Sequence, residues 1–233
     1  MNLDYAKNSI EEVPFGQYLE QFQALDPKAA AVRTGIPYDA ERKCFTMRML
    51  QRTYEISWPE CKVTCLDKTE GVFAIMEDAV DAKIFAIRYL LNGVQSDSTG
   101  KFLTYRELPS GDLYFQQFQG RCLMRLAYGF GFKLDKFAEI MERLGAKKLS
   151  YGDVSYEVEF INEHFVRFIL WAGDDEFPPS SQILFSDNFP LSFETYDLAV
   201  VGDISITTLK KMQKMEDELW DFLQYHVMNL WKY

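Results

Sequence analysis

Alternation of hydrophobic and polar residues along the chain predicts two groups of β-strands. The first group is a hairpin at residues 44–57, with a third short strand expected at residues 61–66. The second group is a strand pair at residues 153–160 and 164–172. A shorter extended stretch is expected at residues 102–105, inside a turn-rich region.

Helical spacing of apolar residues predicts the helices. Residues 14–34 are expected to be helical, with a second helix that has Asp26 as N-cap and Pro27 as its first residue. Gly35 then ends this second helix. Residues 74–92 form the clearest helix, because one polar stripe interrupts an otherwise apolar surface, which places it at the centre of the core. Two more helices are predicted at residues 115–128 and 133–144.

Two helices are expected near the C-terminus. Ser192 is a candidate N-cap for a helix at residues 193–202, with Glu194 and Asp197 near its positive end. A long last helix is predicted at residues 205–231. Its apolar residues recur at near-heptad spacing, so it either packs on the body of the protein or stays exposed for homodimerisation or partner docking. These apolar residues are Leu209, Met212, Leu219, Leu223 and Leu230.

The order of these elements defines the expected fold class. Strands are grouped in two places instead of alternating with helices, which is typical of α+β proteins. We therefore expect a single α+β domain over residues 1–233, with two groups of short antiparallel strands, several packed helices and a long C-terminal helix. A length of 233 residues lies at the upper edge of one domain.

Composition predicts a globular and acidic protein. Hydrophobic residues make up 48% of the chain and aromatic residues 15%, which is sufficient for a large core. The net charge of −10 argues against nucleic-acid binding, because phosphate backbones are held mainly by Lys and Arg. The same charge disfavours docking on an anionic membrane surface. Neither nucleic acid nor membrane is therefore an expected partner.

The pattern of the chain also predicts a cytoplasmic location. Residues 1–7 lack the charged-then-apolar pattern of a secretory signal. Apolar runs such as residues 168–172 are far too short to span a bilayer. The four cysteines of such a chain are expected to be reduced thiols.

An acidic segment from Phe168 to Leu209 is the main candidate for chemistry. Water, helix N-termini, basic groups from elsewhere in the fold or a bound cation would each stabilise its charge. The segment has no Lys or Arg but seven carboxylates, which are Asp174, Asp175, Glu176, Asp187, Glu194, Asp197 and Asp203.

Hard cations such as Mg²⁺, Mn²⁺ or Ca²⁺ prefer several oxygen ligands, so four of these carboxylates are candidate metal ligands. The spacing matches no calcium-binding loop. A stiff loop that contains Pro178 and Pro179 is equally suited to a plain structural turn. The candidate metal ligands are Asp174, Glu176, Asp187 and Glu194.

Other cofactor motifs are incomplete. Cys61 and Cys65 are four residues apart, whereas zinc sites usually show Cys-x2-Cys pairs, and no iron–sulfur motif is complete. The glycine-rich stretch from Gly129 follows a helix and departs from the dinucleotide-binding fingerprint. His164 opens a strand and His226 lies on the last helix, and neither has a visible catalytic partner. A divalent cation remains the candidate cofactor.

Two segments of the chain carry a family resemblance. The first reads FLTYRELPSG at residues 102–111 and continues to Tyr114 and Phe118. The second reads LWAGDDEFP at residues 170–178, followed by ILFSD and then ETYDL before residue 199. This order resembles the family called domain of unknown function 3786, over residues 15–205 of this chain.

The resemblance implies little about activity. Such proteins occur mainly in anaerobic bacteria and archaea, and the family has no established activity. Some relatives carry an added iron–sulfur cysteine motif, which this chain lacks. The resemblance directs attention to Glu107, Asp174, Glu176, Asp187, Glu194 and Asp197 without assigning them roles.

The leading functional hypothesis is a non-catalytic binding or accessory protein of anaerobic metabolism. It is based on the lack of a visible nucleophile–base pair, phosphate loop or complete metal motif. A small molecule or a protein partner would contact an aromatic pocket or apolar patch. The candidate ligand-binding residues are Tyr105, Glu107, Tyr114, Phe115 and Trp171.

The alternative is a metal-assisted enzyme that uses residues 174–203. In this hypothesis Glu107 or Glu194 acts as the general base. The cation would be held by Asp174, Glu176 and Asp187, which must then converge on a common point. A third hypothesis is a purely structural dimer, with a large apolar interface on the last helix.

Overall fold

The computed structural model describes the backbone of residues 13–67 and 71–230 and the side chains of residues 14–67 and 71–218. In this part of the chain, nine strands form one antiparallel sheet in the order β4-β3-β2-β7-β8-β9-β5, with β1 paired to β2 and β6 to β7. The strands are β1 (Tyr38–Asp39), β2 (Cys44–Met49), β3 (Arg52–Ser57), β4 (Val63–Cys65), β5 (Phe102–Thr104), β6 (Lys147–Leu149), β7 (Val154–Ile161), β8 (His164–Trp171) and β9 (Ser180–Ser186).

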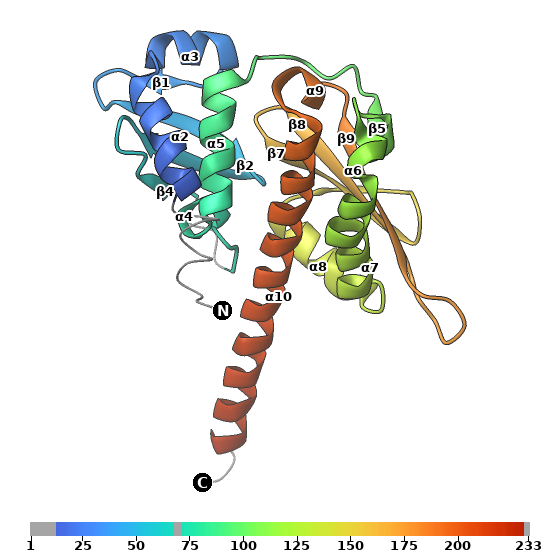
Figure 1. The fold of residues 1–233 in the computed structure, drawn as a ribbon. Helices are drawn as coiled ribbons and strands as arrows, with labels where there is room; N and C mark the ends of the chain where they lie inside the picture. The colour runs from blue at the N-terminus through green and yellow to red at the C-terminus, as the bar shows by residue number, and fades with distance from the viewer. Residues whose placement is uncertain (1–12, 68–70, 231–233) are drawn as a thin grey trace.

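The two predicted strand groups meet within this sheet. Met49 of β2 pairs with Ile161 of β7. Beside that pair, the N–H of Leu50 donates to the carbonyl of Phe160 at 2.8 Å. Leu50 and Gln51 have positive φ values, as the central residues of a type I′ hairpin turn do. This turn connects β2 to β3, and its hydrogen bonds to the end of β7 hold the N-terminal half (β1–β4) and the C-terminal half (β5–β9) of the sheet together. Figure 1 shows the two halves on either side of α10.

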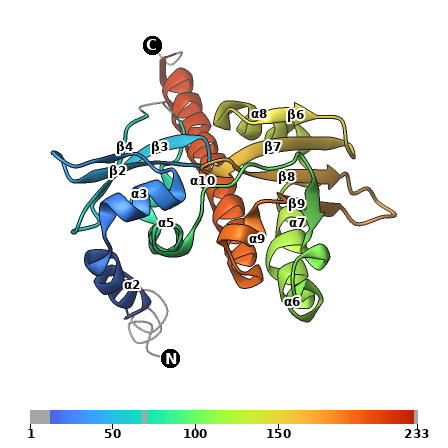
Figure 2. The same ribbon diagram turned by 90° about the horizontal axis from the view of Figure 1, so that it is seen from above.

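Helices pack against the sheet and against one another. In the N-terminal half α5 contacts α2 and α3, whereas α10 contacts α5, α6, α7 and α8. Figure 2 shows α10 between the two halves. The helices are α2 (Val13–Ala24), α3 (Pro27–Thr34), α4 (Ile75–Asp78), α5 (Val80–Asn92), the 3-10 turn η2 (Tyr105–Glu107), α6 (Gly111–Phe118), the π-helical turn η3 (Gln119–Met124), α7 (Arg125–Phe130), α8 (Leu134–Leu144), α9 (Phe189–Ser192) and α10 (Thr195–Leu230). These elements confirm the predicted α+β class.

The start and stop signals of α3 act as predicted. The carboxylate of Asp26 accepts the N–H groups of Lys28 and Ala29 at 2.9 and 3.2 Å. Pro27 is the first residue of the helix. Gly35 ends it with a φ of 70°, in the left-handed region that favours glycine. The predicted strand pairs are likewise confirmed as β2–β3 and β7–β8.

Two predicted helices have different boundaries in the structure. The predicted helix at residues 74–92 is divided into α4 and α5, because Ala79 has an extended backbone. Residues Phe85 and Leu90 of α5 are buried, as the prediction of a central helix requires. The helix expected at residues 115–128 begins earlier, at Gly111, and passes through η3 into α7.

The prediction that Ser192 caps a helix is wrong. Its hydroxyl accepts the N–H of Val94 at 3.1 Å and donates to the carbonyl of Val94 at 3.0 Å, so it ties α9 to the segment after α5. At the start of α10, the carboxylate of Asp197 instead accepts the N–H of Glu194. The two helices predicted near the C-terminus are one continuous helix of 36 residues.

The long helix α10 extends past the rest of the molecule at its C-terminal end (Figure 1). Its residues Leu209 and Met212 are buried, so this part packs on the body of the protein. The predicted homodimer contact depends on side chains of residues 219–230, which lie outside the described residues. Homodimerisation through α10 therefore stays a prediction.

Strand β9 was not predicted by the alternation pattern. It lies between β8 and β5, with Ile183 and Phe185 buried. β8 pairs with residues 180–185 of β9, whereas β5 pairs with the other edge of β9 only at residues 184–186. Among the described strands, none pairs with that edge at residues 180–183, and this part of β9 forms one wall of the site described below.

Candidate functional site

The segment 104–118 separates two hollows on the C-terminal half of the protein. We call the first hollow the aromatic pocket, and it has a volume of about 320 Å³. It lies between η2 and α6 on one side and the start of β9 on the other. Its lining residues are Thr104, Tyr105, Arg106, Phe115, Phe118, Leu123, Trp171, Ser181, Gln182 and Ile183.

Two buried rings form the base of the aromatic pocket. Tyr105 and Phe118 stack with ring centroids 4.0 Å apart and an angle of 7° between their planes. The hydroxyl of Tyr105 donates to the carbonyl of Thr195 at 3.0 Å, which anchors the ring to α10. Burial raises the pKa of Tyr105 to about 12. The Tyr105 side chain is thus neutral and held in place.

Two other rings of the pocket are accessible to solvent. Phe115 is half-buried, and Trp171 at the end of β8 is 38% exposed. The guanidinium of Arg106 lies over the Phe115 ring, 3.8 Å from its centroid. The hydroxyl of Ser181 donates to the carbonyl of Leu123 at 2.7 Å and is therefore already engaged. Arg106 is the charged residue among those that line the pocket.

The second hollow, which we call the α10 hollow, is centred on the first turn of α10 and has a volume of about 420 Å³. Tyr114 and Glu194, both predicted as site residues, line it together. The hydroxyl of Thr195 donates to the carbonyl of Pro109, which fixes α10 to the segment before α6. The other lining residues are Leu108, Ser110, Leu113, Pro190, Phe193, Tyr196 and Leu198.

Close backbone packing holds segment 104–118 in place. A Cβ atom on Gly111 would lie 1.9 Å from the carbonyl oxygen of Tyr105, so only glycine fits there. The carboxylate of Glu107 accepts the N–H and the hydroxyl of Thr104 at 2.7 and 2.9 Å. These hydrogen bonds lower the pKa of Glu107. Glu107 thus stabilises the turn that carries Tyr105 and Arg106, and it lines neither hollow.

The carboxylates predicted as metal ligands have separate roles in the fold. Asp174 accepts the N–H groups of Glu176 and Phe177 at 2.9 and 2.7 Å, and these bonds lower its pKa. Asp187 accepts the hydroxyls of Thr99 and Ser98, which lower its pKa. Both carboxylates therefore stabilise loops.

The predicted convergence of these carboxylates is not found. Glu176 is exposed in the loop between β8 and β9, whereas Glu194 lines the α10 hollow. Among residues 14–67 and 71–218, no group of three or more His, Cys, Asp or Glu side chains is arranged to hold a metal ion.

Basic groups from elsewhere in the fold neutralise other charges of the acidic segment. Arg88 of α5 pairs with Asp197 at 3.0 Å. Arg121 and Arg125 both pair with Asp203. Burial raises the pKa of Asp197, although Arg88 acts in the opposite direction.

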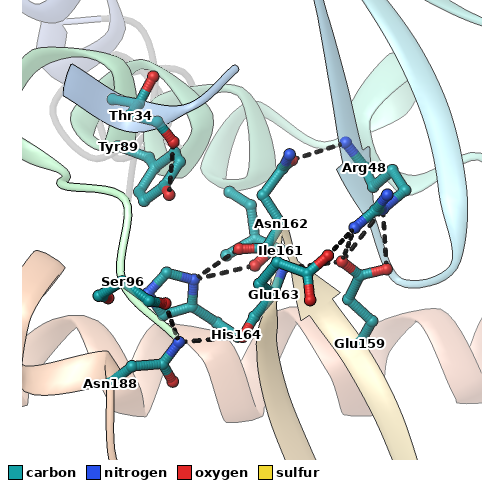
Figure 3. Close-up of polar contacts among 10 residues, drawn as sticks. All are labelled: Thr34, Arg48, Tyr89, Ser96, Glu159, Ile161, Asn162, Glu163, His164 and Asn188. Carbon is teal, nitrogen blue, oxygen red and sulfur yellow. Dashed lines mark hydrogen bonds and ion pairs between the residues drawn. The ribbon is translucent and has the colours of Figure 1, made fainter. Parts of the chain in front are cut away.

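The junction of the two halves of the sheet carries a polar cluster, shown in Figure 3. The guanidinium of Arg48 contacts the carboxylates of Glu159 and Glu163. The side-chain carbonyl of Asn162 accepts the N–H of Arg48 at 2.8 Å. Nearby, the side-chain amide of Asn188 donates to the carbonyl of Glu163 at 3.0 Å. This cluster links β2 to the turn between β7 and β8.

His164 is buried beside this cluster. Its Nδ1 lies 3.1 Å from the carbonyl oxygen of Ile161 and 2.9 Å from that of Asn162, so Nδ1 carries the proton (Figure 3). Among the described residues Nε2 has no hydrogen-bond partner. Its aromatic neighbours are Tyr89, Phe189 and Phe193. Burial lowers the pKa of His164, which is therefore a neutral core residue.

The four cysteines are free thiols, as expected. Cys44, Cys61 and Cys122 are buried, and Cys65 is partly buried. Burial raises the pKa of Cys61 to about 11 and that of Cys122 to about 12. These thiols are therefore protonated at neutral pH.

Of the predicted ligand-binding residues, Tyr105, Phe115 and Trp171 meet at the aromatic pocket, although Trp171 is about 60 residues away in sequence. Tyr114 faces the other hollow. Arg106 lines the aromatic pocket but was not among the predicted site residues. Its position between two predicted site residues, Tyr105 and Glu107, was the available signal.

The fold and these hollows define an α+β protein with an aromatic pocket of small-molecule size. The chain belongs to the family described as a domain of unknown function, DUF3786, whose model matches residues 26–208. That range includes every residue that lines the aromatic pocket. No curated protein and no solved structure matches the chain. Within the described backbone, no helix combines the length and hydrophobicity needed to cross a membrane.

Proposed function

We propose that this protein is a non-catalytic binding protein whose ligand is a flat, largely apolar small molecule held in the aromatic pocket. One observation carries the proposal. Four aromatic side chains line a single cavity, and they come from η2, α6 and the end of β8: Tyr105, Phe115, Phe118 and Trp171. Its volume lies at the lower end of the range of about 300–1,000 Å³ that is usual for small-molecule sites.

The chemistry of the lining supports binding more than catalysis. The ten lining residues include no His, Cys, Asp or Glu, so no general base faces the cavity. Its one serine, Ser181, donates its hydroxyl proton to a backbone carbonyl. Aromatic side chains instead provide dispersion and stacking, with about 0.5–1.5 kcal/mol from each well-placed ring pair.

The pre-formed base of the pocket supports the same proposal. Tyr105 and Phe118 are buried and stacked on each other, so the protein itself holds this surface in place. A ligand that covers this base would bury Phe115 and Trp171 further, which are the two rings that remain accessible. Little ordering is then needed on binding, which favours affinity.

We also propose that the protein acts in the cytoplasm, where thiols stay reduced. The support is that Cys44, Cys61, Cys65 and Cys122 are all free. The proposal of an accessory role in anaerobic metabolism rests on the family resemblance alone.

The proposal is tested by titrating the protein with N-phenyl-1-naphthylamine, a neutral apolar dye that fluoresces in apolar sites. We expect saturable binding of one dye per chain. Phe115→Ala should weaken binding about tenfold, because it removes one wall of the pocket. Tyr128→Ala is the matched control, since Tyr128 is 56% exposed on α7 and does not line the pocket.

Two results would overturn the proposal. One is the absence of saturable binding to the wild-type protein. The other is an equal effect of Phe115→Ala and Tyr128→Ala, which would locate the dye elsewhere. Leu113→Ala should also leave the affinity unchanged, because Leu113 lines the α10 hollow and not the aromatic pocket.

A further inference from the structure

We propose that the natural ligand of the aromatic pocket is a planar aromatic anion, whose negative group pairs with Arg106. This inference rests on the proposed function above and adds the ligand's charge. Its starting point is the sign of the charge at the pocket. The whole chain has a net charge of −10, yet the charged residue that lines this pocket is an arginine.

The positive charge of Arg106 has no other charged residue beside it in the lining of the pocket. The wall formed by Trp171 and residues 181–183 belongs to the acidic segment, which contains no Lys or Arg. The lining itself contains no Asp or Glu to neutralise the guanidinium. An anion inside the pocket therefore meets one positive charge and no lining carboxylate.

Arg106 is available for a ligand in a way that nearby arginines are not. Arg88 pairs with the buried Asp197 at 3.0 Å, and Arg167 pairs with Glu157 at 2.8 Å. The partner of Arg106 is Asp112, at 3.6 Å, and both side chains are largely exposed, at 60% and 75%. Exposed pairs of this length contribute little, so a ligand anion can displace Asp112.

The position of the guanidinium also suits an aromatic anion. It stacks on the Phe115 ring at 3.8 Å, which holds it at the rim of the cavity. A ring face has no lone pairs, so the N–H groups of Arg106 remain able to donate to a carboxylate, sulfonate or phosphate. The apolar rings would then hold the planar part of the ligand, with its anionic group at Arg106.

A matched pair of dyes tests this inference. N-phenyl-1-naphthylamine and 8-anilinonaphthalene-1-sulfonate share one aromatic skeleton, and only the second carries a sulfonate. We expect the wild-type protein to bind the sulfonate at least tenfold more tightly. Arg106→Gln should remove most of that advantage and leave the affinity for the neutral dye within about twofold.

Two variants control for unrelated effects. Lys28→Gln removes one positive charge from the exposed surface of α3 and should change neither affinity. Phe115→Ala should weaken both dyes, since both use the ring. Added salt should weaken the sulfonate more than the neutral dye, because the Arg106 pair is at the rim and partly screened.

The outcomes separate this inference from the proposed function. If the neutral dye binds with the expected response to Phe115→Ala but Arg106→Gln does not change the ratio of affinities, the anionic ligand is ruled out and the binding function stands. An equal loss in Lys28→Gln would also overturn the role of Arg106. If neither dye shows saturable binding, both proposals fail.

Discussion

His164 combines complete burial with a titratable ring. Its pKa is lowered by burial, although the carbonyls of Asn162 and Ile161 and the nearby Glu159 and Glu163 act in the opposite direction. The folded protein therefore binds a proton less readily at this site than the unfolded chain, whose histidine titrates near pH 6.5. Stability from His164 is fully present above pH 6.5 and decreases as the pH falls towards the lower folded pKa.

We therefore predict that the free energy of unfolding decreases from pH 7.5 to pH 5.5, with a contribution from His164 of up to about 1.4 kcal/mol per pH unit. Urea unfolding at several pH values measures this slope. His164→Phe should be less stable at pH 7.5 by about 1–3 kcal/mol, because two carbonyls lose a donor, but should show a flatter pH dependence. His226→Gln is the control, and an unchanged slope in His164→Phe would contradict the assignment.

Variants of Glu107 test whether its carboxylate is structural or catalytic. Its carboxylate accepts two hydrogen bonds from Thr104, and a glutamine carbonyl can accept the same bonds. Glu107→Gln should therefore bind the neutral dye like the wild type, whereas Glu107→Ala should have a lower melting temperature, because the N–H and hydroxyl of Thr104 lose their acceptor. Thermal unfolding and dye titration measure both effects. A large change in Glu107→Gln alone would show that the charge itself matters.

The start of α6 determines whether the aromatic pocket keeps its shape. Gly111→Ala would place a Cβ 1.9 Å from the carbonyl oxygen of Tyr105, so the helix or η2 must move. We expect a loss of stability of about 1–3 kcal/mol, typical of overpacking, together with weaker dye binding. Gly120→Ala, in η3, is the matched control, because no neighbouring atom lies within 4 Å of the new Cβ.

Gly120→Ala should be neutral or slightly stabilising, because alanine restricts the unfolded chain more than glycine does. Chemical denaturation of both variants gives the comparison. Equal stabilities of the two variants would contradict the close packing of Gly111 against Tyr105.

Elements with local signals were predictable from the sequence. The α3 helix follows from Asp26, Pro27 and Gly35, and β7 follows from its alternating residues. β9 was missed because its burial depends on β8, β5 and the helices around it, which are distant in sequence. The role of Ser192 was missed for the same reason: its hydroxyl bonds to Val94, which is distant in sequence, and not to its own helix.

The Arg48 cluster joins the two halves of the sheet. Glu159 is only 7% exposed and depends on Arg48 for its charge partner. Arg48→Ala should destabilise the protein by about 2–3 kcal/mol, below the range for fully buried pairs because the Arg48 side chain is 44% exposed. Thermal or urea unfolding measures the loss.

Arg42→Ala provides the control for this prediction. Its pair with Glu55 lies within the N-terminal half, and the Arg42 side chain is 63% exposed. We expect a change of about 0–1 kcal/mol. If the two variants lose the same stability, the junction does not depend on Arg48.

The candidate site was predictable only in part. Aromatic residues in segment 102–118 and Trp171 were expected to line a binding surface, because small-molecule pockets are lined mainly by hydrophobic and aromatic side chains. Their division between two hollows depends on the path of η2 and α6, which no local pattern specifies. The partners of the carboxylates were only partly predictable: Asp174 accepts N–H groups two and three residues away, whereas Asp187 accepts hydroxyls of Ser98 and Thr99, and Asp197 pairs with Arg88, all distant in sequence.

The most direct test of the central claim is a nuclear magnetic resonance titration of the isotope-labelled protein with N-phenyl-1-naphthylamine. The indole signal of Trp171 is assigned with Trp171→Phe. Binding in the aromatic pocket predicts saturable shifts of that signal and of the backbone amides of residues 104–106 and 181–183. Shifts concentrated at residues 108–114 and 194–198, or no saturable shift at all, would contradict it.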